Sequence, residues 1–174
     1  MAVEGKIRRD IEQLSTTMNG WLHGRNDVTL VTAESLTGGG VSAALTAIQG
    51  TSSYFLGGIV AYSNPAKAQV LHVPEAILAN PGAVSAPCAE AMANGVRDVF
   101  SATFSVATTG LAGPGGGSAR KPVGLVFVAV AGPDGTTAEQ HQFAGEREDV
   151  TEQAIHAGLS LLHDRVRSWL DAAS

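Results

Sequence analysis

Short apolar runs alternate with longer segments of helical periodicity along this chain, and this alternation constrains its fold more than any other feature. Four runs predict strands because they are short, rich in β-branched residues and bounded by glycine or turn residues: 27–33, 57–63, 104–110 and 123–132. Helices are predicted over about 3–23, from the glycines at 38–40 to Gly50, from Asn64 onward, over about 87–100 and over about 146–172. Asn64 is expected to cap the third of these helices, and Ser85 is a possible cap for the fourth. Strands interleaved with helices predict an α/β fold, a three-layer α/β/α sandwich around a mixed sheet.

The length and the last predicted strand set the domain organisation. A chain of 174 residues has the common size of one domain, so residues 1–174 are expected to form a single unit. The turn "GPDG" joins the run at 123–132 to "TTAEQHQFAG", which predicts a β-hairpin. An unpaired edge of this hairpin favours self-association, and a homodimer is expected.

Composition excludes several classes of partner and site. The net charge of −5 and the absence of any Lys or Arg block argue against nucleic acid and anionic membranes as partners. The one cysteine, Cys88, cannot form an intramolecular disulfide, and the histidines lack metal-ligand spacing, so no metal site is expected. The N-terminus has no apolar signal region, and no run approaches the roughly 20 residues that span a bilayer. A cytoplasmic protein is expected.

The stretch "AESLTGGG" follows the first predicted strand directly. Ser35 would stand at the carboxyl edge of the sheet, where open α/β sheets bind their ligands. The glycine-started helix after it offers unpaired N–H groups that could hold a phosphate or an oxyanion. The alternative is structural: Ser35 or Thr37 caps the helix, and the glycines only tighten the turn.

A serine nucleophile needs a base, and the sequence offers a lysine rather than a histidine. No G-x-S-x-G motif is present, and no histidine lies in a glycine-rich or strand-end setting. Lys67 lies in the first turn of the helix that follows the second strand, where the positive helix end disfavours an ammonium and lowers the pKa. Tyr62 could relay a proton between the two. The alternative is a solvated lysine beside a strand-edge tyrosine.

A third stretch, "TGLAGPGGGSARKP", contains the most glycines. It matches neither G-x-x-x-x-G-K-[ST] nor G-x-G-x-x-G, so it is not a standard nucleotide loop. Its glycines, with Thr108, Thr109 and Ser118, could still donate N–H and O–H groups to a phosphate or a ribose. The alternative is a flexible surface loop between two strands.

Five blocks together resemble a known family: "TAESLTGG", "GGIVAYSNPAKAQVL", "GAVSAP", "TGLAGPGGGSARKPVG" and "FAGEREDV". In order and spacing, from about residue 6 to 170, they are similar to the C-terminal domain of the CinA family, which includes nicotinamide mononucleotide (NMN) amidohydrolases. The resemblance implies deamidation of NMN to nicotinic acid mononucleotide and ammonia in pyridine-nucleotide salvage. It implies a catalytic serine at Ser35, a tyrosine at Tyr62 and a lysine at Lys67, with no metal or organic cofactor.

The same resemblance guides the expected substrate contacts. N–H groups near Thr37 to Gly39 would stabilise an oxyanion, and the glycine-rich loop would hold the 5′-phosphate with help from Arg147 or Lys121. Which of the two segments takes which role is left open. Glu34 either orients Lys67 or caps the helix. The expected binding residues are Glu34, Thr37, Gly38, Gly39, Thr109, Gly110, Gly113, Gly115, Gly116 and Arg147.

The chain also departs from the family pattern. Family members usually read "AESCTGG", whereas Leu36 occupies the cysteine position here, a change expected to affect packing rather than chemistry. The molybdopterin-binding-like N-terminal domain of many CinA proteins is expected to be absent. Two other functions are considered: a regulatory module that binds nucleotide without turnover, and a serine amidase acting on another small amide.

Overall fold

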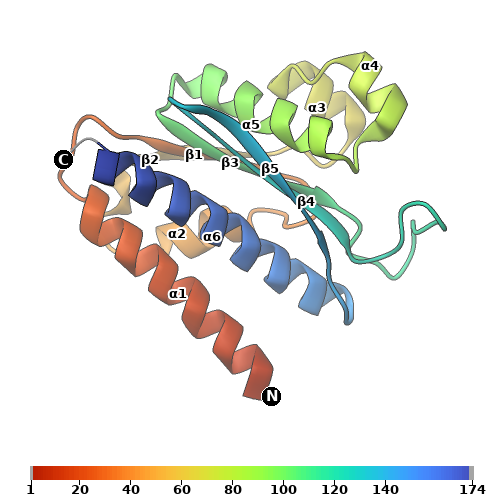
Figure 1. Cartoon of the computed structure of the whole chain (residues 1–174), viewed down its shortest axis with the longest axis horizontal. Coiled ribbons are helices and arrows are strands. Elements are labelled where there is room, and N and C mark those ends of the chain that lie inside the picture. Colours follow the sequence, from red (N-terminus) through yellow and green to blue (C-terminus); the bar gives the residue numbers. More distant parts are fainter. Residues whose placement is uncertain (1, 173–174) are drawn as a thin grey trace.

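The computed structural model describes residues 2–172, and within these residues five strands form one mixed sheet in the order β2-β1-β3-β4-β5 (Figure 1). The strands are β1 (Leu30–Glu34), β2 (Phe55–Val60), β3 (Phe104–Gly110), β4 (Leu125–Gly132) and β5 (Gly135–Gln142). β1 runs parallel to β2 and β3, whereas β3 pairs antiparallel with β4 and β4 with β5. The predicted mixed sheet and C-terminal hairpin are confirmed.

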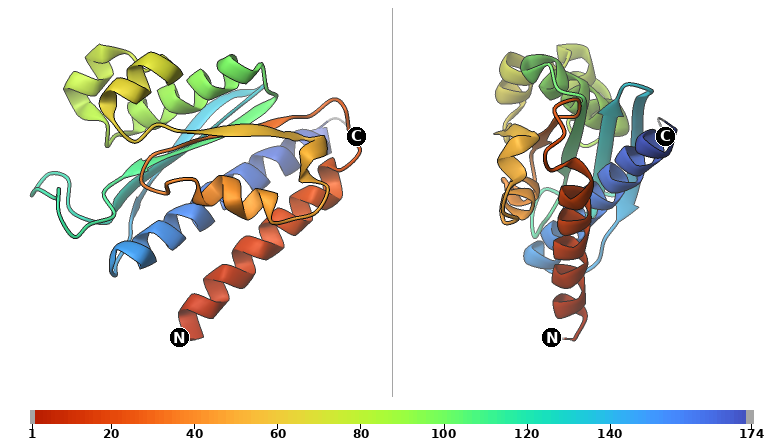
Figure 2. Two further views of the ribbon diagram at one scale, coloured as in Figure 1. Left: turned by 180° about the vertical axis from the view of Figure 1, so that it is seen from behind. Right: turned by 90° about the vertical axis from the view of Figure 1, so that its left-hand side faces the viewer.

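Helices cover both faces of this sheet, as the three-layer prediction requires (Figure 2). One face carries α2 (Gly40–Thr46) and α6 (Arg147–Ala172), with α1 (Ala2–Leu22) packed along α6. The other carries α3 (Asn64–Leu71), α4 (Glu75–Ile77), the π-helical turn η2 (Leu78–Gly82) and α5 (Ala86–Phe100). A 3-10 turn, η1 (Thr51–Ser53), leads from α2 into β2. No helix among residues 2–172 combines the length and apolar character needed to cross a bilayer.

Two hydrophobic cores form because consecutive strand residues face opposite helix layers. Val126, Val128 and Val130 of β4 join the core beneath α1, α2 and α6. Phe127 and Ala129, which alternate with them, join the core beneath α5. All five residues of β1 are buried, because this strand lies inside the sheet with helices on both faces. The buried strands β1 and β3 therefore position the two segments that follow them, which begin at Ser35 and Leu111.

Several element boundaries differ from the sequence prediction. β1 begins at Leu30 rather than Asp27, and α2 ends at Thr46 rather than Gly50. Ser63, not Asn64, caps α3, since its side chain accepts from the N–H of Ala66 at 3.2 Å. The predicted cap at Ser85 is confirmed. The turns α4 and η2 were not predicted from the sequence.

Candidate active site

Ser35 lies at the carboxyl edge of the parallel strands, as the sequence predicted. It follows the last residue of β1, and its backbone N–H donates to the carbonyl oxygen of Thr108 on β3 at 3.0 Å. This bond continues the β1–β3 ladder by one residue and fixes the position of the serine. The backbone of Ser35 is therefore held by the sheet.

Lys67 reaches Ser35 from the first turn of α3. Its Nζ lies 3.0 Å from Ser35 Oγ, 2.9 Å from the carbonyl oxygen of Ala61 and 3.3 Å from that of Tyr62. The lysine is only 2% exposed. No carboxylate among the described residues forms an ion pair with it, so the solvated-lysine alternative is wrong.

Burial decides the protonation of this lysine. Desolvation lowers the pKa of Lys67, because the low-polarity surroundings disfavour an ammonium. A Cys88 thiolate would oppose this effect, but burial raises the pKa of the Cys88 thiol as well. Both groups are therefore shifted toward their neutral forms. A neutral amine beside a serine hydroxyl is the arrangement that general-base activation requires.

The hydroxyl of Tyr62 does not join Ser35 and Lys67. Only its backbone carbonyl contacts Lys67 Nζ, whereas its Oη accepts from Arg147 Nη2 at 3.0 Å. The side chain is 62% exposed and lines the outer part of the site. The structure thus differs from the proton relay that the sequence suggested, because the hydroxyl is bound to Arg147 instead.

Arg147 connects two walls of the site. It is the first residue of α6, and its Nη1 donates to the carbonyl oxygen of Gly113 at 2.8 Å while Nη2 contacts Tyr62. Among the described residues no carboxylate pairs with this guanidinium. Lys121, the other predicted cation, instead donates to the carbonyl oxygen of Pro81 and does not line this pocket.

A pocket of about 240 Å³ joins these groups. Of the predicted site residues it contains Ser35, Tyr62, Lys67, Thr109, Gly110, Gly113, Gly115 and Arg147. It also contains Leu36, Asn64, Ala83, Val84, Leu111 and Ala112, for which the sequence had predicted no role in catalysis or binding. Ala83 and Val84 enter because Thr109 Oγ1 donates to the carbonyl oxygen of Ala83 at 2.8 Å. The block "GAVSAP" was the one sequence signal for them.

Glu34 caps the start of α2 and does not orient Lys67, the two roles that the sequence had left open. Its buried carboxylate accepts from the N–H groups of Gly39, Val41 and Ser42 and from the hydroxyls of Thr37 and Ser42, at 2.7 to 3.1 Å. No contact with Lys67 is present among these bonds. The positive end of α2 is thus occupied by the protein's own carboxylate and is not free for a ligand.

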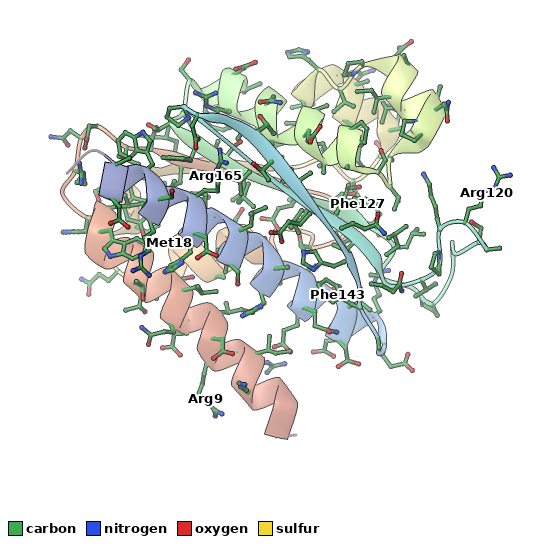
Figure 3. The ribbon with its side chains drawn as sticks, in the orientation of Figure 1. Arg9, Met18, Arg120, Phe127, Phe143 and Arg165 are labelled. Carbon is green, nitrogen blue, oxygen red and sulfur yellow. The ribbon has the colours of Figure 1, made fainter. Side chains whose placement is uncertain are left out.

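This network corrects four of the predicted binding residues. Glu34, Thr37, Gly38 and Gly39 do not line the pocket. The N–H of Gly38 donates to the carbonyl oxygen of Ser35, and that of Gly39 to Glu34, so neither is available to an oxyanion. Gly116 also lies outside the pocket, on the exposed part of the glycine-rich loop. Figure 3 shows Arg120 at the outer end of this loop, directed away from the body of the protein.

Two further observations bear on the chemistry of the site. Leu36, at the family's cysteine position, packs into the core beneath α6, so its side chain contributes to packing as expected. Within residues 2–172 no group of three or more His, Cys, Asp or Glu side chains is arranged to hold a metal ion.

Comparison with known proteins identifies the family of this chain. Residues 12–166 match the CinA C-terminal domain. A CinA-like protein of Synechococcus sp. (strain RCC307) is 51% identical over 83% of this chain and 37% of its own length. One from Geotalea uraniireducens (strain Rf4) is 51% identical over 83% of this chain and 34% of its own length. This chain therefore spans little more than a third of the curated relatives it matches.

Solved structures share the fold over nearly their whole length. The competence damage-inducible protein A (ComA) from Klebsiella pneumoniae superposes with a TM-score of 0.86 at 34% identity, covering 91% of this chain and 98% of that chain. The competence/damage inducible protein CihA from Agrobacterium tumefaciens gives a TM-score of 0.85 at 38% identity, covering 88% and 93%.

Proposed function

Because the chain belongs to the family of the CinA C-terminal domain, we propose that it is an amidohydrolase that converts NMN to nicotinic acid mononucleotide and ammonia. Ser35 is the nucleophile and Lys67 the general base. The observation that carries this proposal is the 3.0 Å contact between Lys67 Nζ and Ser35 Oγ in a buried setting without a carboxylate. A serine beside an unpaired, desolvated lysine is typical of acyl transfer rather than of simple ligand binding.

The three oxygen neighbours of Lys67 suit a neutral amine that accepts a proton. Its two N–H groups donate to the carbonyl oxygens of Ala61 and Tyr62, and its lone pair is left for the hydroxyl of Ser35. The amine then takes the serine proton as Oγ attacks the carboxamide carbon. The electron-poor pyridinium ring makes that carbon more electrophilic.

The reaction proceeds through an acyl-serine. Collapse of the tetrahedral intermediate breaks the C–N bond, and the proton held on Lys67 passes to the departing ammonia. Water then attacks the ester carbon and gives a proton to Lys67, and the C–O bond to Ser35 breaks as Oγ recovers that proton. The nicotinic acid nucleotide leaves, and both residues return to their starting states.

Backbone N–H groups beside the nucleophile stabilise the oxyanion in this proposal. Those of Gly38 and Gly39 are engaged within the protein, but those of Leu36 and Thr37 meet no acceptor among residues 2–172. Leu36 lines the pocket directly after Ser35. We therefore assign its N–H to the oxyanion, where loss of one such donor costs about 3 to 4 kcal/mol in other hydrolases.

Arg147 binds the 5′-phosphate in this proposal. Its guanidinium lines the pocket, has no carboxylate partner among the described residues and keeps N–H groups beyond the two that contact Gly113 and Tyr62. Gly113 and Gly115 form the adjoining wall, where the lack of side chains allows close approach by the nucleotide. The phosphate-binding role thus falls on the glycine-rich loop and the oxyanion role on the turn after Ser35.

Ammonia release tests the proposal. Purified protein is assayed with NMN, nicotinamide riboside and nicotinamide, beside Ser35→Ala and Lys67→Ala. We expect turnover of NMN that falls by about a thousandfold or more in both variants. Exposed Ser52 and Lys6 provide matched controls, because Ser52→Ala and Lys6→Ala make the same chemical changes outside the pocket.

The substrates separate the alternatives. Arg147→Ala should raise KM for NMN and leave turnover of nicotinamide riboside nearly unchanged, since the riboside has no phosphate. Equal rates with NMN and the riboside would point to an amidase for another small amide. Binding of NMN by the wild type without ammonia release would contradict the enzyme and favour a regulatory module.

A further inference from the structure

The polar side chains that line the pocket differ in whether the protein already uses them. Five of them make side-chain hydrogen bonds within residues 2–172: Ser35, Tyr62, Lys67, Thr109 and Arg147. The sixth is Asn64, whose side-chain amide makes no hydrogen bond to the described part of the chain. Its carbonyl oxygen and its two N–H groups are therefore available to a ligand.

Capping of α3 does not account for Asn64. The hydroxyl of the preceding residue, Ser63, accepts from the N–H of Ala66 at 3.2 Å and caps the helix. Asn64 is instead the first residue of α3, and its side chain is exposed on the side of the pocket. An asparagine stabilises a helix start chiefly by capping it, so this side chain has no evident role in the fold.

Asn64 lies on the same face of α3 as Lys67. Residues three apart are neighbours on a helix surface, with about 5 to 6 Å between their Cβ atoms. Helical side chains also lean toward the helix N-terminus, and the amine of Lys67 reaches back to the carbonyl oxygens of Ala61 and Tyr62, which precede the helix. The side chain of the base therefore runs alongside the turn that holds Asn64, and both residues line the pocket with Ser35.

We propose that Asn64 binds the amino group of the substrate's carboxamide, an inference that rests on the proposed function. In that mechanism Ser35 attacks the carboxamide carbon, and the oxyanion faces the N–H of Leu36. The carboxamide nitrogen must receive its proton from Lys67, so it lies on the side of α3. There Asn64 Oδ1 accepts one of its N–H groups.

This hydrogen bond orients the leaving group for the step in which the C–N bond breaks. In the tetrahedral intermediate the nitrogen carries two hydrogens and a lone pair. With one N–H held by Asn64, the lone pair is turned toward the protonated amine of Lys67. The proton moves from Lys67 to the nitrogen, the C–N bond breaks with its electron pair on nitrogen, and the carbonyl re-forms as ammonia leaves. Asn64 is thus a specificity residue for primary amides.

A comparison of amide and ester leaving groups tests this contact. The methyl ester of nicotinic acid mononucleotide offers the same serine a carbonyl carbon, but its leaving oxygen has no N–H to donate. Asn64→Leu removes the acceptor at similar volume. It should lower kcat/KM for NMN by about five- to tenfold, the effect of one hydrogen bond, and change kcat/KM for the ester by less than about twofold.

Asn26→Leu is the matched control, because Asn26 is exposed and lies outside the pocket. This variant should leave both rates unchanged. Circular dichroism and the urea midpoint check that each variant is folded. The pH–rate profile of Asn64→Leu with the ester should keep the apparent pKa of the wild type, since Lys67 is untouched.

The results that contradict the proposal are distinct from one another. Equal loss of amide and ester hydrolysis in Asn64→Leu would overturn the contact with the amino group, because a displaced α3 or a lost contact to the ribose affects both substrates alike. Unchanged hydrolysis of NMN by this variant would overturn it too. A wild type that hydrolyses neither substrate would instead contradict the proposed function, and this inference with it.

Discussion

Lys67 Nζ lies 3.0 Å from Ser35 Oγ, although the two residues are separated by α2, η1 and β2 in the chain. The contact exists because β1 and β2 are parallel neighbours and both continue into the site at the same edge of the sheet. Ser35 follows β1 directly, and α3 carries Lys67 one short turn after β2. The pairing of these strands is therefore a requirement of the proposed chemistry.

The rate of the proposed reaction should follow the protonation of Lys67. Burial lowers the pKa of this lysine, and only the neutral amine can accept the serine proton. The value of kcat/KM should therefore rise with pH and level off, with an apparent pKa below the ordinary lysine value of about 10.4. A pH–rate profile measured with NMN checks this. A rate that keeps rising through that ordinary value would show an unshifted lysine.

The lowered pKa of Lys67 should also make the stability of the protein depend on pH. Between the lowered pKa of Lys67 in the folded state and its ordinary value in the unfolded state, the unfolded chain binds more protons. The free energy of unfolding should therefore rise with pH across this window. Urea denaturation at several pH values measures the slope, and Lys67→Met should reduce it because the titrating amine is gone.

Tyr62→Phe distinguishes a proton relay from a role in positioning Arg147. The Tyr62 hydroxyl accepts from Arg147 and does not contact Ser35 or Lys67. We expect the variant to raise KM for NMN severalfold and to leave kcat within about threefold, because one hydrogen bond contributes roughly 1 kcal/mol. Steady-state kinetics decide the matter. A fall in kcat of about a hundredfold with KM unchanged would instead place the hydroxyl in proton transfer.

Glu34→Ala should destabilise the protein. The variant removes the acceptor for three backbone N–H groups and two hydroxyls at the start of α2. Because buried donors left without partners cost about 1 to 3 kcal/mol, we expect a loss of at least this size in urea denaturation. Glu34→Gln keeps one carbonyl acceptor and should lose less. Equal stability of Glu34→Ala and wild type would contradict the capping role.

Gly95 allows α5 to approach the end of α3, which carries Lys67. A Cβ on Gly95 would collide with the carbonyl oxygen of Leu71. Gly95→Ala should therefore lower the free energy of unfolding by about 2 to 3 kcal/mol, the usual cost of overpacking. Gly20→Ala is the matched control, since a Cβ there meets nothing within 4 Å, and it should be neutral or stabilising by about 0.5 to 1 kcal/mol.

The sequence predicted the fold because its pattern depends on short-range periodicity. Apolar runs bounded by glycine or turn residues marked four strands, and the turn "GPDG" marked the polar fifth strand as the partner of the fourth. The predicted cap at Ser85 reflects a local hydrogen bond from the N–H of Cys88. The prediction was wrong at the start of α3, where two neighbouring polar residues could each cap the helix. Ser63 rather than Asn64 caps α3, since the extended backbone of Ser63 lets its hydroxyl reach the N–H of Ala66.

By itself, the sequence determined that a serine, a lysine and a glycine-rich loop follow strand-like segments, since these features are readable within a few residues. Only the tertiary structure decided which of their atoms meet. It directed the amine of Lys67 to Ser35, paired the hydroxyl of Tyr62 with Arg147, and used Glu34 to occupy the start of α2. These contacts depend on strand order and helix packing, which bring residues from distant segments within hydrogen-bond distance, and no local pattern specifies them.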